Sequence, residues 1–135
     1  MDLEILNIAS DTDNNRIIKN HTHHSKLKNS LCGDEIQINL IIKNDKILDF
    51  GYQGNSCIYC QASASILSKI SINNKKQKID KLCDDVESYF HGKLSKYQEK
   101  KLFSSQLFKK KNFFRKNCIL LPFKALKKIV STKDG

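Results

Sequence analysis

The stretch EIQINLIIKNDKILDFGYQG, residues 35–54, largely sets the expected fold. From Ile36 to Leu40, apolar and polar residues alternate, which is typical of a strand with one buried face. Asn44 and Asp45 then form a turn-like pair before a second strand-like run. The pattern predicts a β-hairpin with strands 35–43 and 46–54.

The rest of the chain predicts one more strand and four helices. HTHHSKLKN should form an edge strand, because its histidines, threonine and lysines tolerate an exposed sheet edge. Apolar residues at helical spacing and capping residues predict the helices. The expected strand covers residues 21–29, and the expected helices cover residues 3–20, 57–70, 79–92 and 117–130. The first helix should fray near DTDNN, the second should be capped by Ser56, and the third should end at Gly92. Residues 73–78 should form a surface connector. Pro122 should lie in the first turns of the last helix, where its missing N–H costs little.

Length and composition favour a single reduced domain. The chain has 135 residues, 39% of them hydrophobic, which suffices for one core, so we expect residues 1–135 to form one domain. The N-terminus carries Asp2 and Glu4 and no long apolar run, so we expect no secretory signal, no membrane span and a cytoplasmic location. Five cysteines, an odd number, then indicate reduced thiols that serve metal or sulfur chemistry.

The net charge of +10 is concentrated in the last third of the chain. From His91 onward there are 13 Lys and Arg residues and two acids, whereas residues 1–90 hold 11 bases and 12 acids. A basic segment can attract nucleic acid or an acidic protein. Aromatic residues such as those in FFRK are sparse, which disfavours a base-stacking platform. We therefore expect a solvated helical surface and no nucleic-acid partner.

Three cysteines lie near the ends of different predicted elements. Cys32 is at a strand entrance, and Cys57 and Cys118 are at helix starts. The free N–H groups of a helix N-terminus stabilise a thiolate, which is the form that binds metal. With Asp34, the set offers three sulfurs and one oxygen, which suits a tetrahedral zinc or a small iron–sulfur cluster.

The other cysteines and the histidines have simpler expected roles. Cys60 should pack in the core, with auxiliary ligation or sulfur relay as the alternative, and Cys83 should be structural on an amphipathic helix. The histidines of the edge strand should be solvated, with adventitious metal binding as the alternative. They are His21, His23 and His24.

Three ordered motifs resemble a known family. NSLCGDEIQINL (29–40), GNSCIYCQASASIL (54–67) and NCILLPFKALKKI (117–129) are similar to the U-type iron–sulfur cluster scaffolds, the group of the NifU N-terminal domain, IscU and SufU. The resemblance implies an α+β fold with a three-stranded antiparallel sheet and helices packed on one face. Carried over by motif, it assigns the exposed metal or cluster site to Cys32, Asp34, Cys57 and Cys118.

The chain departs from the IscU-type branch at two points. Asn117 stands where that branch carries a histidine before the last cysteine, and the chaperone-recognition stretch LPPVK is absent. The chain therefore looks closer to the SufU-like and bacterial NifU-like branches, and the resemblance is weak over residues 91–116. One branch builds clusters and the other accepts sulfur at a zinc site, so both functions stay open.

The resemblance implies a scaffold that receives sulfur from a cysteine desulfurase, binds iron or zinc, and passes a cluster to acceptor or carrier proteins. We expect zinc in the purified protein, and iron and a [2Fe–2S] cluster transiently. The expected persulfide acceptors are Cys32 and Cys118, which follow polar and basic stretches and should lie nearer to solvent than Cys57. The alternatives are a zinc-dependent sulfurtransferase and a basic nucleic-acid or protein adaptor with a closed structural zinc, which the aspartate disfavours.

Overall fold

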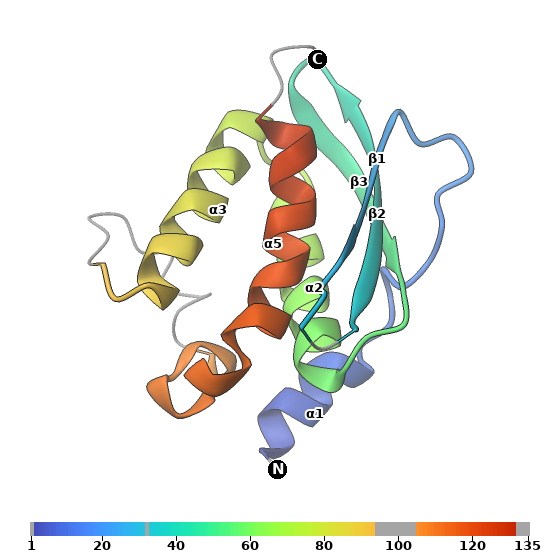
Figure 1. Ribbon diagram of the computed structural model, residues 1–135. Helices are drawn as coiled ribbons and strands as arrows, with labels where there is room; N and C mark the ends of the chain where they lie inside the picture. Colours follow the sequence, from blue (N-terminus) through green and yellow to red (C-terminus); the bar gives the residue numbers. More distant parts are fainter. Residues whose placement is uncertain (1, 32, 94–104, 132–135) are drawn as a thin grey trace.

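The computed structural model describes residues 2–31, 33–93 and 105–131 (Figure 1). Its strands pair antiparallel in the order β1–β2–β3, and the longer helices gather on one side of the sheet. This arrangement confirms the expected α+β fold. The elements are α1 (Leu3–Ser10), β1 (His23–Lys28), β2 (Glu35–Lys43), β3 (Lys46–Gln53), α2 (Ile58–Ser71), α3 (Lys76–Phe90), the 3-10 turns η1 (Gln106–Phe108) and η2 (Lys110–Arg115), and α5 (Lys116–Val130). None of the helices in the described ranges has the length and apolarity needed to cross a membrane.

The predicted hairpin is present as β2 and β3. Asn44 and Asp45 connect the strands with φ angles of 54° and 62°, the left-handed values of a type I′ turn, whose twist suits the flanking strands. The edge strand β1 pairs with β2 so that His23 lies opposite Leu40. Both the hairpin and the edge strand are therefore where the sequence predicts them.

The core lies between the sheet and the helices. Ile36, Ile38 and Leu40 of β2 are each at most 2% exposed, as their alternation predicted. Full burial of each such side chain contributes about 1.5–3 kcal/mol. α2 is rich in buried small residues, and its Ser63 hydroxyl donates to the carbonyl oxygen of Ile119 in α5 at 2.6 Å. Small side chains thus let α2 and α5 pack closely together.

A loop between α1 and β1 covers part of the opposite face of the sheet. Asn39 points away from the core, and its Oδ1 accepts the backbone N–H of Ile18 at 2.7 Å. Gly51 pairs with Asn39, and a Cβ added there would lie 2.4 Å from the carbonyl oxygen of Arg16. The expected helix over residues 3–20 is therefore wrong beyond Ser10, because the chain turns there to cover the sheet.

Two helix starts differ from the sequence prediction. Ser56 does not cap α2; the N-cap is Cys57, and its side chain forms no capping hydrogen bond. α3 begins at Lys76, inside the expected surface connector, and Lys76 is only 4% exposed. The N–H of Lys76 donates to the carbonyl oxygen of Asp45 at 2.7 Å, so the hairpin turn fixes the start of this helix.

Pro122 lies in the second turn of α5, within the first turns as the sequence predicted, but past the residues at which a proline costs little. It is the seventh residue of the helix, beyond the first four, whose N–H groups have no helical partner. A proline at this position cannot donate to the carbonyl of Cys118, one turn earlier. The expectation that this proline costs little is therefore wrong, and α5 lacks one helical hydrogen bond next to Cys118.

The chain leaving β3 passes directly against the chain entering β2. The N–H of Glu35 donates to the carbonyl oxygen of Asn55 at 3.0 Å. Beside this bond, a Cβ added to Gly54 would lie 2.1 Å from the carbonyl oxygen of Glu35. Only glycine fits such a backbone contact, which holds the residues before β2 next to the start of α2.

Replacing Gly54 by alanine should destabilise the protein, because the added methyl group must push two backbone segments apart. We expect a loss of about 1–3 kcal/mol in the free energy of unfolding, as for other overpacked sites. Urea unfolding of the metal-free protein measures it. The exposed neighbour Gln53 provides the control: Gln53→Ala should change stability much less, and equal stability of both variants would contradict this account.

Candidate metal and thiol site

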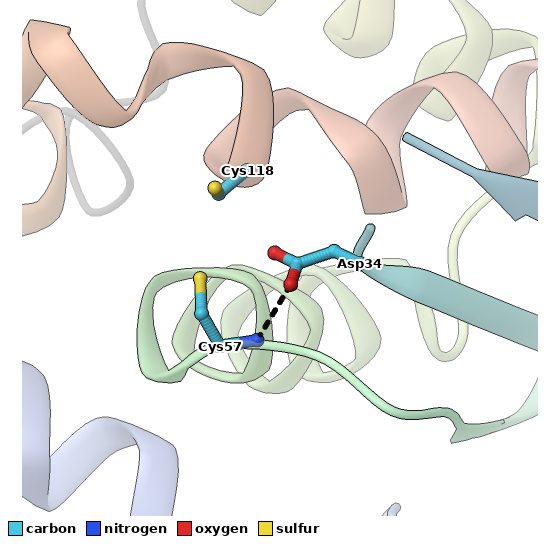
Figure 2. Close-up of side chains that lie close together, drawn as sticks. All are labelled: Asp34, Cys57 and Cys118. Atoms are coloured by element: carbon cyan, nitrogen blue, oxygen red, sulfur yellow. Dashed lines mark hydrogen bonds between the residues drawn. The ribbon is translucent and has the colours of Figure 1, made fainter. Parts of the chain in front are cut away.

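Three side chains with metal-binding atoms meet in the structure: Asp34, Cys57 and Cys118 (Figure 2). One carboxylate oxygen and the two Sγ atoms all lie within 4.8 Å of one another. They come from the turn before β2, the N-cap of α2 and the first turn of α5. Three of the four predicted ligands are therefore brought together, and the fourth, Cys32, lies outside the described residues.

A hydrogen-bonded turn holds Asp34 in place. The N–H of Asn29 donates to the carbonyl oxygen of Asp34 at 2.7 Å, and the N–H of Gly33 donates back to the carbonyl oxygen of Asn29 at 2.8 Å. The side chain of Asn29 accepts the N–H of Leu31 at 2.9 Å. Gly33 has a φ of 77°, a left-handed value that glycine adopts without steric cost. The turn thus fixes the backbone on both sides of residue 32.

The carboxylate of Asp34 is buried beside Cys57. Oδ1 accepts the backbone N–H of Cys57 at 3.1 Å (Figure 2). Oδ2 is also buried, and no group in the described part of the chain donates a hydrogen bond to it. A buried carboxylate oxygen without a partner is costly. A cation held between Asp34 and the two thiols would satisfy this oxygen, so the donor set fits a metal ion.

The thiol of Cys57 is not the stabilised thiolate that the sequence predicts. Burial raises the pKa of Cys57, and the neighbouring carboxylate of Asp34 raises it further. The N–H of Cys60 and the thiol of Cys118 act in the opposite direction without reversing the shift. In the metal-free site Cys57 is therefore a protonated thiol at neutral pH, and metal binding would displace that proton.

Cys118 is more deeply buried than Cys57. It is 3% exposed, whereas Cys57 is half-buried. The expectation that Cys118 lies nearer to solvent than Cys57 is therefore wrong. Because the first turn of α5 packs against α2, it turns Cys118 inward and leaves the preceding Asn117 exposed.

An aromatic and basic stack borders the site and was not assigned to it from the sequence. The guanidinium carbon of Arg115 lies 5.3 Å from the ring centre of Tyr59 and 5.6 Å from that of Phe114. Such distances allow cation–π attraction. Tyr59 follows Cys57 by two residues and Arg115 precedes Cys118 by three, so the stack joins the starts of α2 and α5. The FFRK stretch is its signal in the sequence.

Cys60 and Cys83 lie in the core, as expected. Cys60 is 0% exposed and Cys83 is 3% exposed. Burial raises the pKa of Cys83 far above its ordinary value; the charge of Lys127 opposes this rise, and those of Asp80 and Asp84 add to it. A buried thiol that stays protonated is a poor nucleophile, which fits a structural role for Cys83.

The histidines lie away from this site. The rings of His21 and His24 are 5.6 Å apart, and Nδ1 of His21 shares a hydrogen bond of 2.8 Å with the carbonyl oxygen of Ile18. His24 is exposed, and His21 and His23 are partly so, which agrees with solvated histidines. Among the described residues, no histidine belongs to a group of three metal-binding side chains.

A small helix-covered sheet with two thiols at helix starts and a carboxylate at a strand entrance defines a class of thiol-rich α+β domains with a candidate metal site. The family model of the NifU-like N-terminal domain matches residues 4–111. The chain belongs to this family.

Two named relatives and one solved structure agree with this assignment. The chain is 32% identical over 102 residues to the iron–sulfur cluster assembly scaffold protein IscU of Thermotoga maritima, covering 74% of this chain and 70% of that protein. It is 30% identical over 107 residues to the protein of the same name in Streptococcus pyogenes serotype M1, covering 78% and 67%. A solved structure from Fervidobacterium islandicum AW-1, a candidate cluster assembly scaffold of the SUF system, superposes with a TM-score of 0.87 at 25% identity over 96% of each chain.

Accessibility predicts the order in which the described cysteines react. In the metal-free, reduced protein, iodoacetamide should modify Cys57 before Cys60, Cys83 and Cys118, because the last three are buried. Since the pKa of Cys57 is raised, its rate should still climb with pH above about 8.5, the ordinary cysteine value. Timed quenching and peptide mass spectrometry measure the order, with urea-unfolded protein as the control. Earlier modification of Cys83 or Cys118 would contradict it.

Proposed function

We propose that this chain is an iron–sulfur cluster assembly scaffold, formed by a single domain over residues 1–135. The observation that supports it best is the meeting of Asp34, Cys57 and Cys118 within 4.8 Å, in a chain of the NifU-like N-terminal domain family. Cys32 is proposed as the fourth ligand, because its motif position lies two residues before Asp34. The cluster is the cargo that the scaffold builds and gives up.

The mixed ligand set suits temporary holding. Thiolates bind soft iron or zinc strongly, whereas a carboxylate is a harder and more exchangeable ligand. The free Oδ2 of Asp34 is available for the metal while Oδ1 accepts the N–H of Cys57. Because Asp34 is the exchangeable ligand among thiolates, a ligand from a partner protein can replace it first when the metal or cluster is transferred.

Sulfur for the cluster is proposed to come from a cysteine desulfurase. A thiolate of the scaffold attacks the outer sulfur of the desulfurase persulfide; the new S–S bond forms as the old one breaks, and the desulfurase cysteine leaves as a thiolate. The proposed acceptors are Cys32 and Cys118. Because Cys118 is 3% exposed, sulfur transfer to it requires the first turn of α5 to open.

A zinc-dependent sulfurtransferase is the second candidate. It is favoured by the same donor set, because cysteine and aspartate ligands also make a tetrahedral zinc site. In this function the zinc stays bound as the thiols accept sulfur, and no cluster is assembled. For either function we propose a cytoplasmic protein that works with a desulfurase and with acceptor proteins, and without nucleic acid.

Metal analysis tests the proposed site directly. We expect one zinc ion per chain in protein purified in air, because cysteine thiolates together with an aspartate form a donor set that binds zinc. Cys57→Ser and Cys118→Ser should lose most of this zinc, whereas the matched control Cys83→Ser should keep it. Elemental analysis measures the content. Folded protein that neither contains nor takes up zinc would remove the proposal.

Anaerobic reconstitution separates the two candidate functions. With ferrous iron, cysteine, a cysteine desulfurase and a thiol reductant that supplies the two electrons needed to reduce each persulfide sulfur to sulfide, a scaffold should gain iron and acid-labile sulfide in equal amounts together with the visible absorption of a cluster. A sulfurtransferase should keep its zinc and, in a parallel sample without the reductant, gain only persulfide. Retained zinc without sulfide would therefore favour the second candidate.

Asp34 should control release more than binding. We expect Asp34→Ala to retain metal or cluster through the thiolates, but to release it to a chelator or acceptor roughly tenfold more slowly, a change of about 1.4 kcal/mol in the barrier. Stopped-flow transfer to a chelator measures the rate. Asp34→Asn, which keeps an oxygen for the N–H of Cys57, separates the loss of charge from the loss of that hydrogen bond. The exposed Asp13→Ala is the control, and unchanged release in both Asp34 variants would refute this role.

A further inference from the structure

A groove lies beside the metal site, between the chain that follows β1 and the first turns of α5. Its volume is about 280 Å³, and its walls include Leu27, Lys28, Leu31, Asn117, Leu121 and Lys124. We call it the β1–α5 groove. β1 and α5 are neighbours in the fold (Figure 1), and residues 117, 121 and 124 share one face of the helix because they are spaced by four and three positions.

The groove has an apolar floor and an exposed apolar rim. Leu121 is 3% exposed, and Leu27 packs against the core. Leu31, in contrast, is 80% exposed, more than any other large apolar side chain in the described residues. Covering a leucine contributes about 1.5–3 kcal/mol. A partner with an apolar side chain would therefore gain by closing over Leu31.

The described residues that line the groove carry positive charge. Lys28 and Lys124 are among them, none of them is acidic, and no ion pair found in the described part of the chain includes either lysine. Lys127, one turn further along the same helix, is paired with both Asp80 and Asp84. The groove therefore favours an occupant that carries carboxylates.

Its position ties the groove to the thiols. Leu31 directly precedes Cys32, and Asn117 directly precedes Cys118. The groove volume of about 280 Å³ accommodates one large side chain of a protein segment, and that segment would contact the residues next to both proposed persulfide acceptors.

We propose that the β1–α5 groove is the docking site for a segment of the sulfur-donating cysteine desulfurase that carries one large apolar side chain flanked by carboxylates. The apolar side chain covers Leu31 and Leu121, and the carboxylates pair with Lys28 and Lys124. This inference rests on the proposed function, because it needs a sulfur donor whose persulfide must reach the adjoining thiols.

The test uses the zinc-loaded protein and the purified cysteine desulfurase. Calorimetry should show that Lys28→Glu/Lys124→Glu binds the desulfurase at least about tenfold more weakly, and Leu31→Ser about tenfold more weakly, as for central interface residues. Lys128→Glu is the matched control, since it reverses an exposed charge on the same helix outside the groove. It should bind within about twofold of the unaltered protein, as expected for a charge away from the interface.

A photo-crosslinking amino acid in place of Leu31 identifies the occupant. The crosslinked desulfurase peptide should contain an apolar residue flanked by Asp or Glu; a basic or uncharged peptide would overturn the proposal. Groove variants that bind as tightly as the unaltered protein would also overturn it, while the zinc content of the same samples still supports the proposed function. Unaltered protein that neither holds zinc nor binds the desulfurase would overturn both.

Discussion

The site depends on the backbone contact between Gly54 and Glu35. This contact brings the exit of β3 so close to the entrance of β2 that no side chain fits between them. Asp34 directly precedes Glu35 in the chain, and Cys57 follows Gly54 by three residues. The hydrogen bond from the Cys57 N–H to Asp34 then follows from the sheet itself. A thiol and a carboxylate are thus positioned by the sheet and its connections, while Cys118 comes from a separate helix.

Two features of the site suit a bound cation. One oxygen of Asp34 is buried with no partner among the described residues, and the thiol of Cys57 keeps its proton because burial raises its pKa. A cation would bind this oxygen and displace the thiol proton. Cys60 and Cys83 show the contrasting case of thiols buried in the core. Local environment, more than residue type, separates the proposed ligands from the structural cysteines.

The sequence predicts the sheet well because the sheet is specified locally. The alternation from Ile36 to Leu40 and the Asn44–Asp45 turn each depend only on near neighbours. The predictions are wrong where contacts with segments distant in the sequence determine the local structure. The start of α3 is fixed by the carbonyl of Asp45, and the segment after α1 is held by Asn39 across the sheet. The burial of Cys118 depends on how α5 packs against α2, which neither its basic neighbours nor its spacing encode. The motifs of the proposed ligands are visible in the sequence. That only one carboxylate oxygen of Asp34 has a hydrogen-bond donor among the described residues could be learned only from the tertiary structure.

The proposed ligands come from the sheet entrance and from the starts of α2 and α5, so bound cargo would cross-link distant parts of the chain. A cross-link that closes long loops restricts the unfolded chain, and a ligand that binds only the folded form stabilises it. The domain would then be cross-linked while it carries the cargo and would lose this cross-link on release. Without the cross-link, the first turn of α5 would be the least restrained part of the site, because Pro122 removes one helical hydrogen bond there. The order of this helix end would then depend on whether cargo is bound, so a partner protein could distinguish loaded from empty molecules without contacting the metal.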